Sequence, residues 1–390
     1  MRQATCFYCA ICLTFLMEGF GIADVKIGVA GPITGPNASY GAQLTQGVSQ
    51  AAEDFNKSGG ILGQKIWVEQ GDDVSDPKQG VSVANKFVGD GVKFVVGHFN
   101  SGVTIPASEV YAENGVLFIT PSATNTKVTD RKLWDAFRTC GRDDQQARLW
   151  ASFALRYGGH FAIIHDRSNY GQSLAEASRS YMNSGGKKEV LYEGVNVGEK
   201  DYSSIVSKVR SSGANYLLWT GLHVEGGLIA REMRAQGLKT VMIAGDGIAD
   251  DQFAQIGGPG AEGVLMTFNP EPRKNPNAKN VIAEFKSKGY DPQGYTLYSY
   301  AAMQVMKEAA EATKSLDPKK MAEYMHSGKP FNTVLGEITY DGKGDRKTVD
   351  FTWYIWRRDN SGRIIFDQND DPCCPKTGDC PPPSPPNCPN

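Results

Sequence analysis

The sequence has almost no excess of charge and no long apolar run in its body. Its 41 basic and 43 acidic residues are mixed along the chain and give a formal net charge of -2 at pH 7. Nucleic acid attracts proteins through a basic surface patch, which this composition does not provide. After the first residues, no segment approaches the roughly 18 uninterrupted apolar residues that a membrane-spanning helix needs. A nucleic-acid-binding or membrane-embedded body is therefore disfavoured.

Cysteine is scarce in the part of the chain that should fold. Of eight cysteines, three lie in residues 1–23 and four in residues 373–388, which leaves Cys140 alone between them. The final segment has no histidine and is rich in proline, which favours a disordered, extended appendage over a metal site. We expect such a tail at residues 368–390, and pairing among its own cysteines stays open.

Familiar catalytic motifs are also missing. The chain has no phosphate-binding loop, no Gly-x-Ser-x-Gly turn and no His-Glu-x-x-His pair. Residues 258–263 match the dinucleotide pattern Gly-x-Gly-x-x-Gly, but they precede a predicted strand instead of following one, which favours a turn. His98 is expected to be a packed loop residue rather than a general base. We therefore expect no cofactor, no metal and no enzymatic activity.

What is present begins with a predicted export signal in residues 1–23. One early cation, Arg2, precedes an apolar stretch, and the small residues Gly21 and Ala23 stand just before Asp24. This is the layout of a secretory signal peptide. Cleavage after Ala23 would release the mature protein outside the cytoplasm, and we expect the periplasm as its location.

From Asp24 to about Phe268, short β-branched runs alternate with amphipathic stretches of helical period, which predicts parallel sheets flanked by helices. The predicted strands are residues 25–30, 66–69, 94–97, 117–120, 161–165, 190–194, 216–219, 241–244 and 264–268. The predicted helices include residues 43–56, 78–88, 144–157, 171–182 and 225–236, with right-handed crossovers. Nine strands are too many for one ordinary open sheet, so two lobes are expected.

Two segments interrupt this alternation, and we interpret them as passages between the lobes. They are the polar residues 139–145 and the proline-rich residues 269–276, and a turn at 342–347 would make a third passage. The elements expected after them are helices near 280–288, 297–313 and 318–327 and strands near 334–339 and 351–358. The resulting lobes are residues 24–141 plus 272–350 and residues 142–271 plus 351–367.

A binding site is expected where the carboxyl ends of the parallel strands meet, because loops and helix N-termini converge there. The loops after these strands contain Tyr40, Phe99, Ser101, Ser122, Thr124, Tyr170, Leu222 and Asp246. The first half supplies hydroxyl and backbone N–H donors, while the second half supplies aromatic groups and a carboxylate. This combination suits a zwitterion, with its carboxylate at Ser101 and Thr124 and its ammonium at Asp246.

Each of these residues also has a plainer interpretation. Serine and threonine after a strand are often helix caps, the two tyrosines could pack between loops, and Asp246 could serve a turn between two glycines. The functional interpretation gains weight because all the residues fall on the same edge of the predicted sheets.

These residues and several segments resemble the branched-chain amino-acid-binding proteins of bacterial ABC transporters. The matching segments, which run from Asp24 to about Asp367, are Tyr40-Gly41-Ala42-Gln43, Asp76-Pro77-Lys78-Gln79, Gly97-His98, Pro106-Ala107-Ser108, Ile119-Thr120-Pro121, His165-Asp166, Tyr170-Gly171, Gly198-Glu199-Lys200-Asp201 and Tyr300-Ala301-Ala302. The resemblance implies a type I periplasmic-binding-protein fold, an α/β architecture with two doubly wound lobes, three crossovers and a ligand buried between them.

The resemblance also implies a role for each candidate residue. The ligand carboxylate would meet the hydroxyls of Ser101 and Thr124, and the ammonium would meet the Ser122 carbonyl, the Thr124 hydroxyl and Asp246. Tyr40 and Tyr170 align with aromatic residues that cover the ligand, and Phe99 falls beside the pocket for its side chain. The partners implied are a small amino acid and the permease of an ABC importer, with the protein itself a monomer.

The chain departs from the family pattern at three places. The ammonium-binding glutamate is replaced by Asp246, which is one methylene shorter, and a tyrosine of the second lobe is replaced by Leu222. The two positions of the family's disulfide are Ser75 and Asn100, so no disulfide is expected there. The first two changes leave the identity of the ligand's side chain open. An extracytoplasmic sensor of amides or amino acids is the alternative function that the same fold allows.

Overall fold

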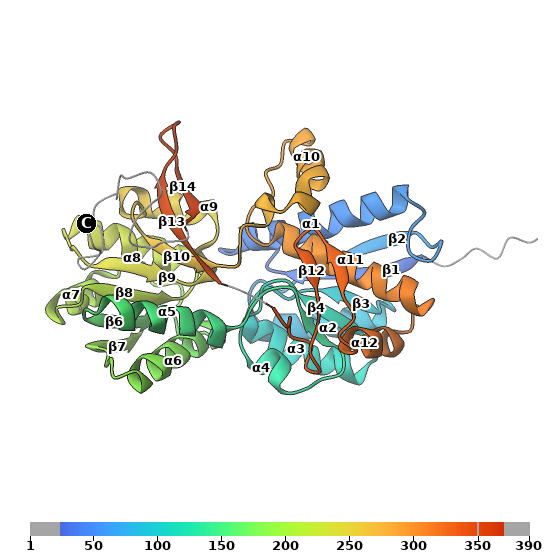
Figure 1. The fold of residues 1–390 in the computed structure, drawn as a ribbon, viewed down its shortest axis with the longest axis horizontal. Coiled ribbons are helices and arrows are strands. Elements are labelled where there is room, and N and C mark those ends of the chain that lie inside the picture. Colours follow the sequence, from blue (N-terminus) through green and yellow to red (C-terminus); the bar gives the residue numbers. More distant parts are fainter. Residues whose placement is uncertain (1–23, 349–350, 370–390) are drawn as a thin grey trace, which may run out of the picture.

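The computed structural model describes residues 24–348 and 351–369. The chain forms two α/β lobes that lie side by side, with the termini of the described chain on different lobes (Figure 1). The predicted signal peptide, and the predicted tail from residue 370 onward, lie outside the described residues.

The first lobe is built on a parallel sheet with the strand order β2-β1-β3-β4-β5. The strands are β1 (Val25–Gly31), β2 (Ile66–Asp72), β3 (Phe94–Val96), β4 (Leu117–Thr120) and β5 (Ala136–Arg138). Successive residues of the central strands are buried on opposite faces; Phe94 and Val96 join one apolar cluster while Val95 joins another. Continuous apolar runs form these strands because helices cover both faces.

The helices of this lobe come from both ends of the described chain. They are α1 (Ala38–Lys57), α2 (Pro77–Gly89), α3 (Ser101–Glu113), α4 (Lys127–Asp130), α10 (Lys279–Ser287), α11 (Thr296–Thr313) and α12 (Pro318–His326). Helix α1 packs directly against α11 (Figure 1). Gly47 permits this approach, because a Cβ at that position would lie 2.2 Å from the carbonyl oxygen of Thr296. The first lobe is thus complete only when the late helices are present.

The second lobe contains a mixed sheet with the order β14-β13-β10-β9-β8-β6-β7. Its strands are β6 (Phe161–His165), β7 (Leu191–Gly194), β8 (Tyr216–Thr220), β9 (Val241–Ala244), β10 (Leu265–Phe268), β13 (Thr352–Arg358) and β14 (Ile364–Gln368). The strands from β7 to β10 are parallel, and β13 and β14 add an antiparallel edge. Its helices are α5 (Asp143–Tyr157), α6 (Asn169–Ser184), α7 (Ser203–Ser211), α8 (His223–Ala235) and α9 (Asp251–Gly257).

The chain passes between the lobes near the segments predicted for the first two passages. The second passage contains two 3-10 turns, η3 (Pro272–Lys274) and η4 (Pro276–Ala278). Residues 342–347, predicted as the third passage, instead form a turn closed by a bridge between Tyr340 and Arg346, and the chain leaves the first lobe after it. Ion pairs join this turn to the first passage: the Asp345 carboxylate lies 2.9 Å from Arg138 Nε and 2.6 Å from Arg142 Nη1. Arg138 and Asp345 are both buried.

The structure corrects three sequence-based expectations about elements. A single strand was expected at residues 334–339, but the chain forms a hairpin of β11 (Phe331–Thr333) and β12 (Gly336–Ile338) around a glycine at positive φ. The strands β5 and β14 were not predicted. Because β14 extends through Gln368, that residue belongs to the sheet and not to the expected tail.

Two features of the fold bear on function. The turn η2 (Gly258–Gly260) begins the segment 258–263 that matches the dinucleotide pattern, and this segment precedes strand β10, as predicted. None of the helices in residues 24–348 and 351–369 combines the length and the apolar character needed to cross a bilayer.

Candidate functional site

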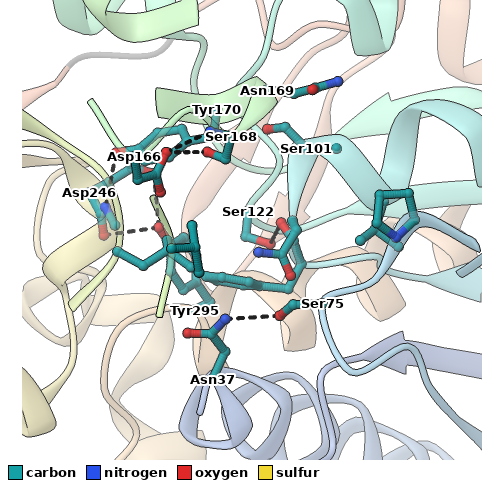
Figure 2. Close-up of a pocket in the computed structure, with 18 residues that line it drawn as sticks. Asn37, Ser75, Ser101, Ser122, Asp166, Ser168, Asn169, Tyr170, Asp246 and Tyr295 are labelled. Carbon is teal, nitrogen blue, oxygen red and sulfur yellow. Dashed lines mark hydrogen bonds between the residues drawn. The ribbon is translucent and has the colours of Figure 1, made fainter. Parts of the chain in front are cut away.

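A cavity of about 260 Å³ lies between the two lobes, at the carboxyl ends of their parallel strands. The loops after β1, β3 and β4 line it from the first lobe, and the loops after β6, β8 and β9 line it from the second. Figure 2 shows Ser101 and Ser122 across the space from Asp166 and Asp246. The described residues that line it include two carboxyl groups and no lysine, arginine or histidine. The cavity therefore favours a ligand with a positive pole.

A buried hydrogen-bond network holds the loop after β3 in place. The two ring nitrogens of His98 lie 2.7 Å from Asp73 Oδ2 and 2.9 Å from the Tyr111 hydroxyl oxygen, and all three side chains are fully buried. The His98 carbonyl accepts hydrogen bonds from the hydroxyls of Thr104 and Thr120. As predicted, His98 is a packed loop residue whose ring nitrogens are both used. It fixes the position of the residues that follow.

Ser101, the first residue of α3, lines the cavity, as does Ser122 in the loop after β4. Ser101 Oγ accepts the backbone N–H of Asn125 at 3.2 Å, which leaves its hydroxyl hydrogen available to an acceptor in the cavity. The hydroxyl of Ser122 is used, because it donates to the Phe99 carbonyl at 3.1 Å. A helix N-terminus with a free hydroxyl suits a carboxylate.

Asp246 begins the 3-10 turn η1 (Asp246–Ile248) after β9, and it lines the opposite side of the cavity. The Tyr170 hydroxyl donates to its Oδ1 at 3.0 Å, and the Tyr295 hydroxyl donates to its Oδ2 at 2.8 Å (Figure 2). Burial raises the pKa of Asp246 to about 6, although both tyrosine hydroxyls lower it. A carboxylate can accept more than two hydrogen bonds, so Asp246 retains the capacity to bind an ammonium group.

Aromatic side chains close one end of the site. The rings of Tyr40 and Phe99 stack with their centroids 4.2 Å apart, and Tyr295 meets Phe99 edge to face at 5.4 Å. Phe99 lines the cavity, whereas Tyr40 lies behind it, fully buried. Leu222, immediately before α8, adds an apolar contact from the second lobe.

The structure thus brings together at one cavity six of the eight residues predicted from the sequence. Thr124 and Tyr40 are not among the residues that line it. Tyr40 supports Phe99, and Thr124 is buried behind Ser122 with 1% of its surface exposed. The two positions of the missing disulfide, Ser75 and Asn100, both line the cavity, and Ser75 accepts a hydrogen bond from Asn37 at 3.0 Å.

Sequence reasoning missed Tyr295 and Asp166. The other site residues were found because they follow the ends of predicted strands. Tyr295 instead stands immediately before helix α11, so this criterion did not identify it. Asp166 directly follows β6, which is a signal that could have identified it, and its Oδ1 accepts from both the backbone N–H and the hydroxyl of Ser168. Burial raises the pKa of Asp166 to about 6.

Direct hydrogen bonds close the two lobes over the cavity. The Tyr40 hydroxyl donates to the Gly247 carbonyl at 2.7 Å, and Gln43 Nε2 donates to Asp250 Oδ2 at 2.8 Å. Near the passages, Asn125 Nδ2 donates to the Asn169 carbonyl at 2.8 Å. The second lobe therefore contacts the first through α1 and through the loop after β4.

Two α/β lobes joined by three passages around one buried cavity define the class of two-lobed solute-binding proteins. Residues 24–363 match the family model described as "Periplasmic binding protein". The chain belongs to this family, among the relatives named for Leu/Ile/Val binding.

The chain is similar to curated relatives over most of its length. It is 50% identical to "Leu/Ile/Val-binding protein homolog 1" of Brucella suis biovar 1 over 370 residues, which is 94% of this chain and 100% of the relative. It is 48% identical to "Amino acid binding protein" of Pseudomonas aeruginosa, over 88% of this chain and 92% of the relative.

Solved structures show the same fold. The leucine-binding protein LivK of Thermotoga maritima is 26% identical with a TM-score of 0.80, over 88% of this chain and 97% of that chain. LivJ of Streptococcus pneumoniae, in complex with isoleucine, has a TM-score of 0.78 at 22% identity, over 88% of this chain and 99% of that chain. These likenesses confirm the expected α/β fold with two lobes.

Proposed function

We propose that this protein is the periplasmic solute-binding protein of an ABC importer and that it binds a branched-chain or related small amino acid between its lobes. The observation that carries the proposal is the cavity itself, which opposes the Ser101 hydroxyl and the α3 N-terminus to the Asp246 carboxylate. The names of the curated relatives support an amino acid as the ligand. The likeness to solved structures described as substrate-binding proteins of transporters favours transport over the alternative of an extracytoplasmic sensor.

In this proposal the ligand is bound by its two charged ends. The carboxylate binds at Ser101 and the first turn of α3, and the ammonium binds at Asp246 and the Ser122 carbonyl. Charged groups are costly to bury unless they are paired and hydrogen-bonded, so the closed lobes select a molecule that completes both sets of contacts. Phe99 and Leu222 are left to contact the ligand's side chain.

Closure is the step that the importer would sense. The proposed rigid bodies are residues 24–141 with 272–350 and residues 142–271 with 351–367, moving about the passages near Asp345. Because Ser101 and Asp246 belong to different bodies, an amino acid that contacts both stabilises the closed state. The protein acts as a monomer, makes or breaks no covalent bond, and delivers the ligand to a permease.

A thermal-shift measurement tests the proposal. The purified mature protein is heated with each common amino acid and with small amides. Since a ligand that binds only the folded state must raise the melting temperature, small apolar amino acids should give the largest increases. A response to amides without a response to any amino acid would reject the proposal.

A further inference from the structure

The wall of the cavity contains a second carboxyl group that a zwitterion bound by its two ends does not use. Asp166 directly follows β6 and lines the cavity from the second lobe, and Figure 2 shows it with Asp246 across the space from Ser101 and Ser122. Only 2% of its surface is exposed. An amino acid whose ammonium binds at Asp246 therefore leaves Asp166 as a buried acid in the wall around the ligand.

The protein itself uses only one of the two carboxyl oxygens of Asp166. Oδ1 accepts the backbone N–H of Ser168 at 2.9 Å and the Ser168 hydroxyl at 2.6 Å. It also lies so close to Gly171 that a Cβ there would collide with it. No group of the described residues donates to Oδ2, and Oδ2 is not among the unpartnered oxygens that the protein covers completely. The carboxyl group is thus held by Oδ1, while Oδ2 stays open to a donor in the cavity.

The described residues also provide no cation for this carboxylate. The guanidinium of the next residue, Arg167, turns away and donates to the Asn196 side chain at 3.0 Å and to the Gly194 carbonyl at 2.8 Å. Burial raises the pKa of Asp166 to about 6, and the negative charge of Glu225 adds to this effect. Since a buried carboxylate is stable only when it is paired, Asp166 lacks an opposite charge that a ligand can supply.

A carboxylate only accepts hydrogen bonds, and it binds charged donors most strongly. We propose that Asp166 is a second cation-binding position in the cavity, and that the protein binds short diamino acids, such as 2,4-diaminobutyrate, as well as small apolar amino acids. The α-ammonium of such a ligand binds at Asp246, and its side-chain ammonium donates to Asp166 Oδ2. The proposal rests on the proposed function and deepens it, because it adds a class of side chain to the ligands of the same site.

A purely apolar side-chain pocket would exclude a diamino acid. Burial of an unpaired ammonium is costly, so a ligand that met only Phe99 and Leu222 would lose most of its affinity when its terminal methyl group became an ammonium group. An ion pair with Asp166 offsets this cost. The affinities for an apolar amino acid and for the diamino acid of the same shape should therefore be similar.

Calorimetry at pH 7.5 with L-norvaline and L-2,4-diaminobutyrate tests the proposal, because the two ligands differ only in a terminal methyl or ammonium group. The wild-type protein should bind diaminobutyrate with an affinity within tenfold of its affinity for norvaline. Asp166→Asn keeps an acceptor for Ser168 but removes the charge. It should weaken the binding of diaminobutyrate at least tenfold more than the binding of norvaline.

Asp317→Asn is the matched control. Asp317 accepts the backbone N–H groups of Lys319 and Lys320 at the start of α12, so the same substitution is made at a turn of similar geometry, outside the residues that line the cavity. Both of its affinities should equal those of the wild type. Asp166→Ser also removes the charge, and it replaces the asparagine variant if that variant does not fold.

Two results would overturn the role of Asp166. One is a wild-type affinity for diaminobutyrate that is more than tenfold below that for norvaline. The other is an equal effect of Asp166→Asn on both ligands. If either occurs while the wild-type protein binds norvaline, the proposed function stands and only the second cation-binding position has failed. If the wild-type protein binds no amino acid of either kind, the proposed function itself has failed.

Discussion

The carboxyl group of Asp246 lies between two tyrosine hydroxyls, in a cavity wall that contains no basic side chain among the described residues. Burial destabilises the carboxylate form more than these two hydrogen bonds stabilise it, so the pKa of Asp246 is raised to about 6. An ammonium group would reverse this balance, since an opposite charge nearby favours the carboxylate. Ligand binding should therefore release a proton near pH 6.

This linkage gives the affinity a predictable dependence on pH. The pKa of the ligand-free site lies above that of the complex, so protons compete with the ligand, and affinity is full above about pH 7 and falls as the pH is lowered through 6. At pH 5 the dissociation constant should be about tenfold higher than at pH 7.5, as calorimetry across this range would show.

Asp246→Asn identifies the group responsible. The variant should bind an amino acid about 100-fold more weakly at pH 7.5, because the ammonium loses its counter-charge, and most of the pH dependence should disappear. The buried carboxyl groups of Asp143 and Asp166 also have raised pKa values, and their titration would account for any pH dependence of the affinity that remains. An unchanged affinity in the folded variant would remove Asp246 from the site.

At the scale of the element, the passages between the lobes depend on a buried ion-pair cluster. Asp345, in the turn between Tyr340 and Arg346, pairs with Arg138 at the end of β5 and with Arg142 before α5, and it accepts the Thr129 hydroxyl at 2.8 Å. Removing one partner from a buried ion pair leaves an uncompensated charge, which is more damaging than removing both.

Asp345→Asn should therefore reduce the free energy of unfolding by about 3–5 kcal/mol, measured by urea denaturation. Asp359→Asn makes the same chemical change at an exposed turn, where Asp359 pairs with Arg363, and should change the stability little. Equal losses of stability in the two variants would mean that burial of the ion-pair cluster does not make it more important for stability than an exposed ion pair.

Most of the elements were predictable, for a physical reason. Strands β4, β6 and β9 have the predicted bounds, because each is a continuous buried run between turn residues. Strand β5 was missed because it has three residues and ends in Arg138, an arginine whose burial depends on a partner about 200 positions away in the sequence. The pattern of residues around β5 gives no information about such a distant partner.

The site was predictable to a similar degree. Ser101, Ser122, Tyr170 and Asp246 follow strand ends, and the position of a strand end in a parallel sheet can be deduced from the sequence. The contact of Tyr295 with Asp246 could not be deduced, because it joins a helix start in one lobe to a turn in the other and exists through their closure.

At the scale of the whole molecule, helix α1 joins the lobes across the cavity. The Tyr40 hydroxyl donates to the Gly247 carbonyl in the second lobe, so Tyr40→Phe should weaken the closed state and leave each lobe intact. We expect a dissociation constant about 3–10 times higher, equivalent to one hydrogen bond, and a larger radius of gyration of the ligand-free protein in X-ray scattering.

Tyr300→Phe is the matched control for this variant. Its hydroxyl donates to Asp54 Oδ2 at 2.9 Å, a bond between α11 and α1 within the first lobe, so its loss should leave both the affinity and the radius of gyration unchanged. A loss of affinity in both variants would indicate general destabilisation instead of an effect on closure.

The packing of α11 on α1, and of β13 beside β10, also determines how the protein can be made. Each lobe takes its first strands from before the second passage and completes its core with residues that follow it. A nascent chain that stops before residue 350 lacks the buried tryptophans of β13, and one that stops before residue 296 lacks α11 as well. Neither lobe can complete its native core during synthesis until these late residues have been translated.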